Sequence, residues 1–301
     1  MSSAFELRNI IKRYPDFQLG PLSLSVEPGT VLGYIGPNGS GKTTTMHCMT
    51  GLVKPDSGDI EIFGRRNDPN QPDWKFDIGY VGDVHVFYEN WTAAKNLKFL
   101  SKFYPNWSDE YMMNLVQRFK LPLDRKAKAL STGNRVKLAL VSALAHRPKL
   151  LLLDEPTAGL DPVVRTEVLD ILFEVLEDGD RAIFYSTHIL SDIARLADEL
   201  AFLDNGSIKL RTAKEMLTDH WRRISFRLPQ HQQLISGVVS HKNEGAEHQV
   251  ISADHEITLR QLRELGAENI YENRMSIDEI SVEILKGDKH VVTAQNGNGV
   301  S

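Results

Sequence analysis

Hydrophobic and polar positions alternate along the first part of the chain. The segments FELRNIIKRY and LSLSVEPGTV carry an apolar residue at roughly every second position, with a Pro28-Gly29 turn inside the second segment. Alternation of this kind is typical of strands with one buried face. We therefore expect antiparallel strands near the N-terminus, leading into the apolar strand TVLGYI.

The pattern changes from Lys149 onward to continuous apolar runs separated by helical segments. The expected strands are KLLLLDEP, RAIFYST and LAFLDNG, and the helices between them are PVVRTEVLDILFEVLEDG and HILSDIARLADE. Continuous apolar strands between helices indicate a sheet covered on both faces, as in an α/β fold.

Residues 84–130 differ from both patterns, because aromatic residues recur there on helical spacing and Pro105 and Pro122 interrupt them. We expect a helical insertion, and we interpret its aromatic residues as core rather than as a base-stacking surface. They are Phe87, Tyr88, Trp91, Phe99, Phe103, Tyr104 and Trp107.

The C-terminal part of the chain has a weaker pattern. Two strands (RISFRLP and HQVISA) and two helices (EITLRQLRELGA and SIDEISVEILKG) predict a small α+β domain at residues 221–287. The tail at 288–301 has little to bury, so we expect it to be disordered. Residues 1–220 then form the first domain, with a helical subdomain at about 84–148.

Composition limits the classes that need to be considered. Acidic and basic residues are interspersed and the net charge is −5, which leaves no basic footprint for nucleic acid. The single cysteine, Cys48, excludes an internal disulfide framework and suits a reducing cytosol. No stretch approaches the ~20 apolar residues of a transmembrane helix, and we expect neither a signal peptide nor a membrane span.

The stretch GPNGSGKTTT, at residues 36–45, carries glycines, hydroxyls and a lysine but almost no apolar surface. Glycines let the backbone turn its N–H groups inward, and a helix N-terminus adds partial positive charge. The pattern G-x-x-x-x-G-K-[ST] lies here between a predicted strand and a predicted helix, which is the context of a phosphate-binding loop. We expect a nucleotide to be held by Asn38, Gly39, Ser40, Gly41, Lys42, Thr43 and Thr44.

Two adjacent carboxylates, Asp154 and Glu155, end the buried strand LLLLDEP. Ionised groups in that position are costly unless solvent or a cation meets them, and Mg²⁺ on a nucleotide is such a cation. We expect Thr43 and Asp154 to bind the metal, directly or through water, and Glu155 to orient or deprotonate an attacking water. The alternative is an acidic pair that only caps the following loop.

A second small polar loop, LSTGN, precedes the apolar-faced helix RVKLALVSALA. It places another helix N-terminus, and so another device for binding an anion, in the same chain. One nucleotide does not need two such devices on one protomer, whereas two nucleotides shared between two protomers do. The alternative is a helix cap made by Ser131 and Asn134, and both interpretations can hold together.

Taken together, these residues resemble the nucleotide-binding subunit of an ABC (ATP-binding cassette) transporter over about residues 4–220. GPNGSGKTTT matches the family's Walker A motif, LLLLDEP its Walker B motif and AGLD its D-loop. His188 matches the switch histidine, and Tyr14 stands where the family stacks an aromatic ring on adenine. LSTGN occupies the signature position, with Thr132 and Asn134 in place of the usual glycine and glutamine.

The resemblance implies an α/β P-loop NTPase fold and a head-to-tail dimer, with an identical copy or another ABC ATPase subunit. One subunit would bring to each ATP and its Mg²⁺ the residues Lys42, Thr43, Asp154, Glu155 and His188. The other subunit would bring Ser131, Gly133 and Asn134. Asp161 of the D-loop joins the nucleotide-binding set, and the catalytic residues are Glu155, His188 and Lys42.

A further departure from the family is Asp83, which stands where the family has glutamine after IGYV-x. Aspartate is shorter by one carbon–carbon bond, about 1.5 Å, and carries a full negative charge. Either it is too short to reach the site, or it joins Asp154 and Glu155 around Mg²⁺ as a third metal-site carboxylate. We favour the second possibility.

The C-terminal region looks like the accessory domain of ABC-2-type exporter ATPases. The resemblance therefore implies a Mg²⁺-dependent ATPase that drives separate membrane-spanning permease subunits, with the chain in the cytoplasm and bound to the inner face of the membrane through them. The alternative is an ABC ATPase that is not engaged in transport. Such proteins usually carry two cassettes or long coiled-coil insertions, and this chain shows neither.

Overall fold

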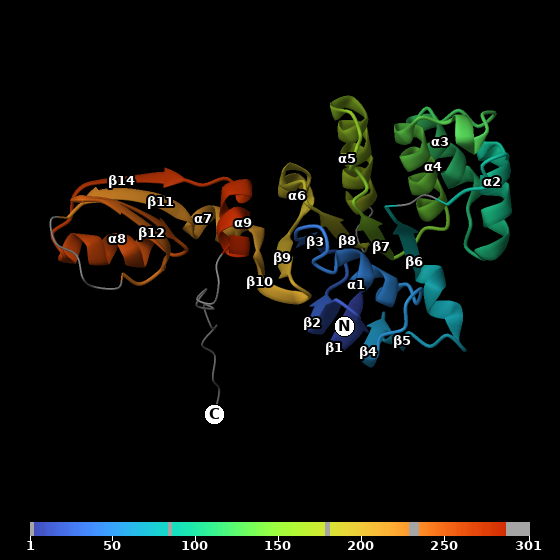
Figure 1. Ribbon diagram of the computed structural model, residues 1–301. Coiled ribbons are helices and arrows are strands. Elements are labelled where there is room, and N and C mark those ends of the chain that lie inside the picture. Colours follow the sequence, from blue (N-terminus) through green and yellow to red (C-terminus); the bar gives the residue numbers. More distant parts are fainter. Residues whose placement is uncertain (1–2, 84–85, 178–180, 229–234, 287–301) are drawn as a thin grey trace. The chain divides into compact units, whose positions relative to one another are not determined.

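The computed structural model describes four stretches of the chain, residues 3–83, 86–177, 181–228 and 235–286 (Figure 1). The tail expected at residues 288–301 lies outside them. None of the described helices has both the length and the apolar character needed to cross a membrane.

The chain divides into two compact units. The first comprises residues 1–198 and 203–208, and the second comprises residues 199–202 and 209–301, as far as these are described. The domain boundary near residue 220 stays a prediction.

The N-terminal strands of the first unit pair as expected. They form an antiparallel sheet in the order β2-β1-β4-β5. Its strands are β1 (Phe5–Tyr14), β2 (Phe17–Val26), β4 (Ser57–Ile62) and β5 (Arg65–Arg66). Bulges shift the register of β1 after Leu7 and after Ile10 on its β2 side, which the simple alternation of the sequence does not encode.

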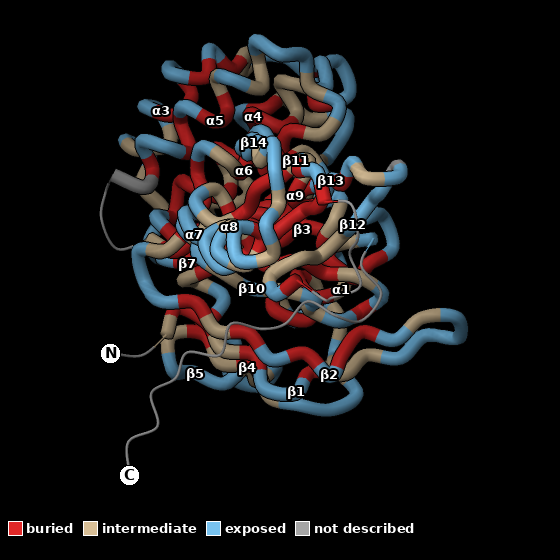
Figure 2. The backbone as a smooth tube through the Cα atoms, turned by 90° about the vertical axis from the view of Figure 1, so that its left-hand side faces the viewer, coloured by how far each residue is buried: buried red, intermediate tan, exposed pale blue. Residues whose placement is uncertain are grey.

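A six-stranded sheet in the order β10-β9-β3-β8-β7-β6 carries the site. Its strands are β3 (Val31–Ile35), β6 (Ile78–Val81), β7 (Leu150–Asp154), β8 (Ala182–Thr187), β9 (Glu199–Asp204) and β10 (Ser207–Ala213). The central strands β3, β8 and β7 run parallel to one another and are buried at every position, in agreement with their continuous apolar runs (for β3, see Figure 2). Because parallel strands end at the same edge, this sheet brings the segments that follow β3, β7 and β8 together.

Helices α1 (Lys42–Met49), α5 (Pro162–Glu177) and α6 (Leu190–Leu196) connect these strands. Helix α1 packs against β7, and α6 packs against β3 and β8. The helical insertion is present as α2 (Ala93–Leu100), α3 (Asp109–Arg118) and α4 (Thr132–Leu144), with short 3₁₀ turns at Pro72–Asp77, Ser101–Phe103 and Ala127–Ala129.

The second unit contains a four-stranded antiparallel sheet in the order β12-β13-β11-β14. Its elements are α7 (Lys214–His220), β11 (Arg222–Arg227), β12 (Val238–Glu244), β13 (Glu247–Ser252), α8 (His255–Glu264), β14 (Glu268–Arg274) and α9 (Ile277–Lys286). Ile224, Phe226 and Val250 of the sheet pack with Leu262 of α8 in a core of their own. The small α+β domain expected from the sequence is thus present.

Candidate functional site

The phosphate-binding loop connects β3 to α1. Gly41 adopts φ = 111° at the start of α1, a backbone conformation that favours glycine. A Cβ atom on Gly36 would stand 2.3 Å from the carbonyl oxygen of Leu203, so only glycine fits there. Lys42 is buried and its Nζ donates a hydrogen bond to the carbonyl oxygen of Gly36 at 2.7 Å. The loop therefore holds its one ammonium group inside itself.

A pocket of 730 Å³ opens above this loop. Nine of the residues expected from the sequence line it, namely Tyr14, Asn38, Gly39, Gly41, Lys42, Thr43, Thr44, Asp83 and Glu155. Ser40 lies beneath the surface, and its hydroxyl has no hydrogen-bond partner among the described residues. The loop that lines this pocket supplies the backbone, the hydroxyls and the buried ammonium group that binding of a nucleoside triphosphate requires.

Three further residues line the same pocket and were missed from the sequence. Asp16 and Phe17 follow Tyr14 around the β1–β2 turn, and Asn205 lies in the turn between β9 and β10. That turn is fixed to the phosphate loop, since the backbone N–H of Gly206 donates to the carbonyl oxygen of Ser40 at 2.9 Å. Long-range contacts of this kind bring Asn205 to the pocket, so no local pattern could have identified it.

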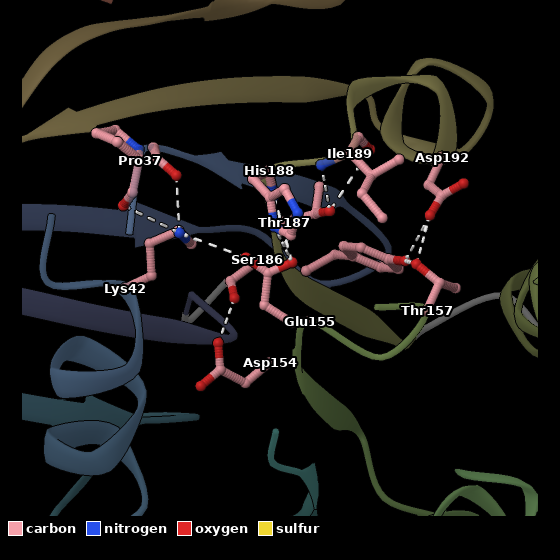
Figure 3. Close-up of polar contacts among 12 residues, drawn as sticks. Pro37, Lys42, Asp154, Glu155, Thr157, Ser186, Thr187, His188, Ile189 and Asp192 are labelled. Atoms are coloured by element: carbon pink, nitrogen blue, oxygen red, sulfur yellow. Dashed lines mark hydrogen bonds and ion pairs between the residues drawn. The ribbon is translucent and has the colours of Figure 1, made fainter. Parts of the chain in front are cut away.

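Glu155 is held in an unusual conformation at the end of β7. Its φ is 50°, in the left-handed region, and its N–H donates to the carbonyl oxygen of Ser186. Oε2 lies 2.9 Å from Nδ1 of His188 and accepts a hydrogen bond from the His188 backbone N–H (Figure 3). Oε1 makes no hydrogen bond among the described residues and lies 3.4 Å from Nζ of Lys42. The three residues expected to be catalytic thus meet in one place.

Asp154 is completely buried beside them. Its Oδ1 accepts a hydrogen bond from the Ser186 hydroxyl, while Oδ2 has no partner among the described residues. An unpartnered carboxylate oxygen in the interior is costly unless a cation meets it. Thr43, whose side chain is exposed in the adjoining pocket, offers a hydroxyl as a second ligand. The donor chemistry therefore fits Mg²⁺ bound to a nucleotide.

Asp83 lines the same pocket with an exposed side chain. Burial, followed by the charges of Asp154 and Asp83, raises the pKa of the Tyr80 hydroxyl, so both carboxylates act on this group. In the described part of the chain no three histidine, cysteine, aspartate or glutamate side chains form a cluster that could hold a metal ion by themselves. A metal at this site would need oxygen atoms from a nucleotide as well.

The signature residues lie outside this pocket. Ser131 caps α4 by accepting a hydrogen bond from the N–H of Asn134 at 3.3 Å, as the capping interpretation expects. A Cβ atom on Gly133 would stand 3.0 Å from Val164 of α5, so this loop packs on the helix that follows the D-loop. Asp161 caps that helix, accepting from the N–H groups of Val163 and Val164. The described chain therefore does not place these four residues at its own phosphate loop.

The fold and the phosphate site together define a P-loop ATPase. Residues 19–158 match the family model described as ABC transporter. The chain is 35% identical over 204 residues to the ABC transporter ATP-binding protein YtrB of Bacillus subtilis, covering 67% of this chain and 70% of that protein. It is 32% identical over 212 residues to the Nod factor export ATP-binding protein I of Cupriavidus metallidurans, covering 68% of this chain and 70% of that one.

A solved structure described as the ATP-binding subunit of an ABC transporter superposes with a TM-score of 0.65 at 28% identity, covering 71% of this chain and 92% of that chain. The chain belongs to the family of ABC transporter ATP-binding subunits. It is an ATP-binding protein and an ATPase whose hydrolysis is coupled to transport, as the sequence resemblance implied.

Proposed function

We propose that this chain is the Mg²⁺-dependent ATPase of an exporter, that Glu155 is its catalytic base, and that two ATP molecules are shared between two subunits. The observation that carries the proposal is the meeting of Lys42, Glu155 and His188 beside the unpartnered oxygen of Asp154. The name of the Cupriavidus metallidurans relative supports export as the direction.

The residues divide the chemistry between them. The ammonium group of Lys42 donates to carbonyl oxygens of the loop and faces Glu155. A bound phosphate would replace part of these contacts. Glu155 keeps Oε2 on His188, while Oε1 makes no hydrogen bond among the described residues and faces Lys42. Once a bound phosphate draws the ammonium group away, Oε1 would accept a proton from water, as a general base requires. Thr43 and Asp154 would hold Mg²⁺, which supplies electrostatic stabilisation of the phosphate oxygens. Tyr14 is 43% exposed at the pocket rim and offers its ring face to adenine.

The proposed dimer follows from the separation of the two expected anion-binding sites, the phosphate loop and the signature loop. Ser131, Gly133 and Asn134 begin helix α4, with Gly133 packed on α5, and do not line the pocket that contains Lys42. Two copies arranged head to tail would put the signature loop of each over the phosphate loop of the other. The partner is either an identical chain or a related ATPase subunit, and Asp161, at the start of α5, would lie at the same interface.

A groove of 410 Å³ is the proposed docking site for the permease. It lies between β6 and the helical insertion, and its apolar lining includes Leu52, Trp74, Val86, Phe87, Leu100 and Tyr104. Val86 and Leu52 are 87% and 64% exposed, which is costly for an unpartnered surface. Lys75 is the one charged residue among the described residues that line it. A short, mainly apolar cytoplasmic segment with one carboxylate fits this groove and would hold the chain at the inner face of the membrane.

Two variants test the catalytic assignment. Glu155→Gln keeps the shape of the side chain and loses its proton acceptor, so we expect ATP binding without turnover. Lys42→Ala removes the only ammonium in the loop, so we expect both binding and turnover to fall. Glu264→Gln, on the exposed surface of α8, is the matched control and should behave as the natural protein. Near-normal hydrolysis by Glu155→Gln would remove Glu155 from the role of base.

Membrane association tests the proposed docking groove. A tagged chain expressed with its membrane subunits should stay with washed membranes, and Val86→Asp should release it, because the substitution buries a charge against an apolar partner. Ile257→Asp, on α8, is the matched control. Retention of the Val86 variant would place the docking surface elsewhere. A natural chain found only in the supernatant would favour an ABC ATPase without a transport role.

A further inference from the structure

A second set of buried polar groups includes Thr157, which follows Glu155 by two residues in the chain. The hydroxyl of Thr157 donates to Oδ2 of Asp192 at 2.5 Å and lies 3.1 Å from the hydroxyl of Tyr185, which is itself 3.4 Å from the same carboxylate oxygen (Figure 3). All three side chains are at most 1% exposed. Burial and the charge of Asp192 raise the pKa of Tyr185, so its hydroxyl remains protonated and available as a donor.

Arg165 of α5 compensates the charge of this buried aspartate. Its Nε donates to Oδ1 of Asp192 at 2.5 Å, and a terminal nitrogen donates to the hydroxyl of Ser191 at 2.6 Å. A buried carboxylate that is paired and hydrogen-bonded in this way is held in one position. Asp192 therefore presents a fixed acceptor to Thr157, and it ties the segment after Glu155 to helix α6.

The conformation of Glu155 shows why such a tie is needed. A residue with a side chain is strained at φ = 50° and keeps this conformation only where its surroundings impose it. On the N-terminal side, pairing of Asp154 with Ser186 and the N–H of Glu155 on the Ser186 carbonyl fix the chain. On the C-terminal side, the side chain of Thr157, the residue after Pro156, is anchored by its hydrogen bond to Asp192.

We infer that Thr157 and Asp192 are positioning residues for ATP hydrolysis. Asp192, charge-compensated by Arg165, holds Thr157, and Thr157 holds the Glu155 carboxylate beside His188 and Lys42. Neither residue lines the nucleotide pocket, so they act on the reaction only through Glu155. The inference rests on the proposed role of Glu155 as the catalytic base.

The distinguishing substitutions are Thr157→Val, which removes the hydroxyl and keeps the shape, and Thr157→Ser, which keeps the hydroxyl. Because displacement of a catalytic group by about 1 Å costs on the order of a hundredfold in rate, we expect Thr157→Val to lower kcat by tenfold or more. The KM for ATP and the affinity for a non-hydrolysable ATP analogue should stay within about twofold, since the pocket is untouched. Thr157→Ser should restore most of kcat.

Thr258 supplies the matched control. It is as buried as Thr157 and its hydroxyl bonds Ser252 and the carbonyl oxygen of Ser236, but it lies in the second unit. Thr258→Val should therefore cost stability without changing kcat. If Thr157→Val is too unstable to assay, Tyr185→Phe removes another hydroxyl of the same network, and it should also lower kcat at unchanged KM.

A double substitution separates this inference from the proposed role of Glu155. If Glu155 is the base and Thr157 acts through it, adding Thr157→Val to Glu155→Gln should lower the residual rate no further. Full turnover by Glu155→Gln alone would refute the role of Glu155. If Glu155→Gln is inactive while Thr157→Val turns over normally, or loses ATP affinity in parallel with rate, the positioning role of Thr157 is refuted.

Discussion

Two buried aspartates should respond in opposite directions to the same substitution. Asp154 and Asp192 are 0% and 1% exposed, yet Oδ2 of Asp154 has no partner among the described residues, while Asp192 is paired with Arg165. Asp154→Asn removes an uncompensated charge and keeps an oxygen for the Ser186 hydroxyl. Asp192→Asn instead leaves the guanidinium of Arg165 without its counter-charge.

The magnitudes follow from these environments. A charged group buried without a partner costs more than a neutral amide in the same place, so Asp154→Asn should raise the free energy of unfolding of the nucleotide-free protein, by roughly 1–3 kcal/mol. At roughly 2–4 °C for each kcal/mol, the midpoint of the first unit should rise by about 2–12 °C. Breaking a buried ion pair costs about 3–5 kcal/mol, so Asp192→Asn should lower the midpoint by a comparable or larger interval.

The assay is thermal unfolding by calorimetry, with EDTA and then with Mg²⁺ and ATP. Saturating ligand at a hundred times its Kd adds about 2.7 kcal/mol to the natural protein, and Asp154→Asn should lose most of this gain because its metal ligand is gone. A midpoint below that of the natural protein for nucleotide-free Asp154→Asn would refute the reasoning. So would an undiminished stabilisation of this variant by Mg²⁺ and ATP.

Three further outcomes follow. ATPase activity should depend steeply on Mg²⁺ concentration, and Asp83→Asn should make that dependence shallower. Asp83→Gln restores the longer side chain that the family has at this position. Identical Mg²⁺ curves for the natural protein and Asp83→Asn would show that Asp83 is not a metal ligand. Burial lowers the pKa of His146, so below pH about 6.5 the unfolded chain binds a proton at this residue that the folded protein does not bind. The free energy of unfolding should therefore fall as the pH drops below about 6.5, and it should fall less in His146→Gln. Equal pH profiles of stability for the two proteins would contradict this. Burial raises the pKa of the Cys48 thiol to about 11, so iodoacetamide at pH 8 should modify Cys48 only as the protein unfolds. Rapid modification of the folded protein would contradict the burial of this thiol.

The sequence predicted the parts of the site that depend on contiguous residues. The phosphate loop at residues 36–45 and the pair Asp154 and Glu155 could be identified because each carries its chemistry within one short segment, and the comparisons confirm the family. Parallel strands ending at one edge then bring His188 to Glu155, which was expected from the resemblance rather than from spacing.

The parts that could not be predicted depend on long-range contacts. Asn205 reaches the pocket because its turn is bonded to the phosphate loop and to β2. The contact of Thr157 with Asp192 spans 35 residues, across α5 and β8. In the second unit, strands β12 and β14 were missed. Strand β14 is exposed at nearly every position and lies at the edge of its sheet, so it has no buried face to impose an alternating pattern.

The central claim is that two copies of this fold enclose ATP between the phosphate loop of one and the signature loop of the other. The most direct test is the mass of Glu155→Gln by size-exclusion chromatography with light scattering, with and without Mg²⁺ and ATP. We expect one chain without nucleotide and twice that mass with it. Ser131→Arg in the same background should bind ATP and remain a single chain, while Ser57→Arg, at an exposed position of strand β4, should still form the dimer. A Glu155→Gln protein that binds ATP and stays monomeric at saturation, or a Ser131→Arg variant that pairs normally, would contradict the shared site.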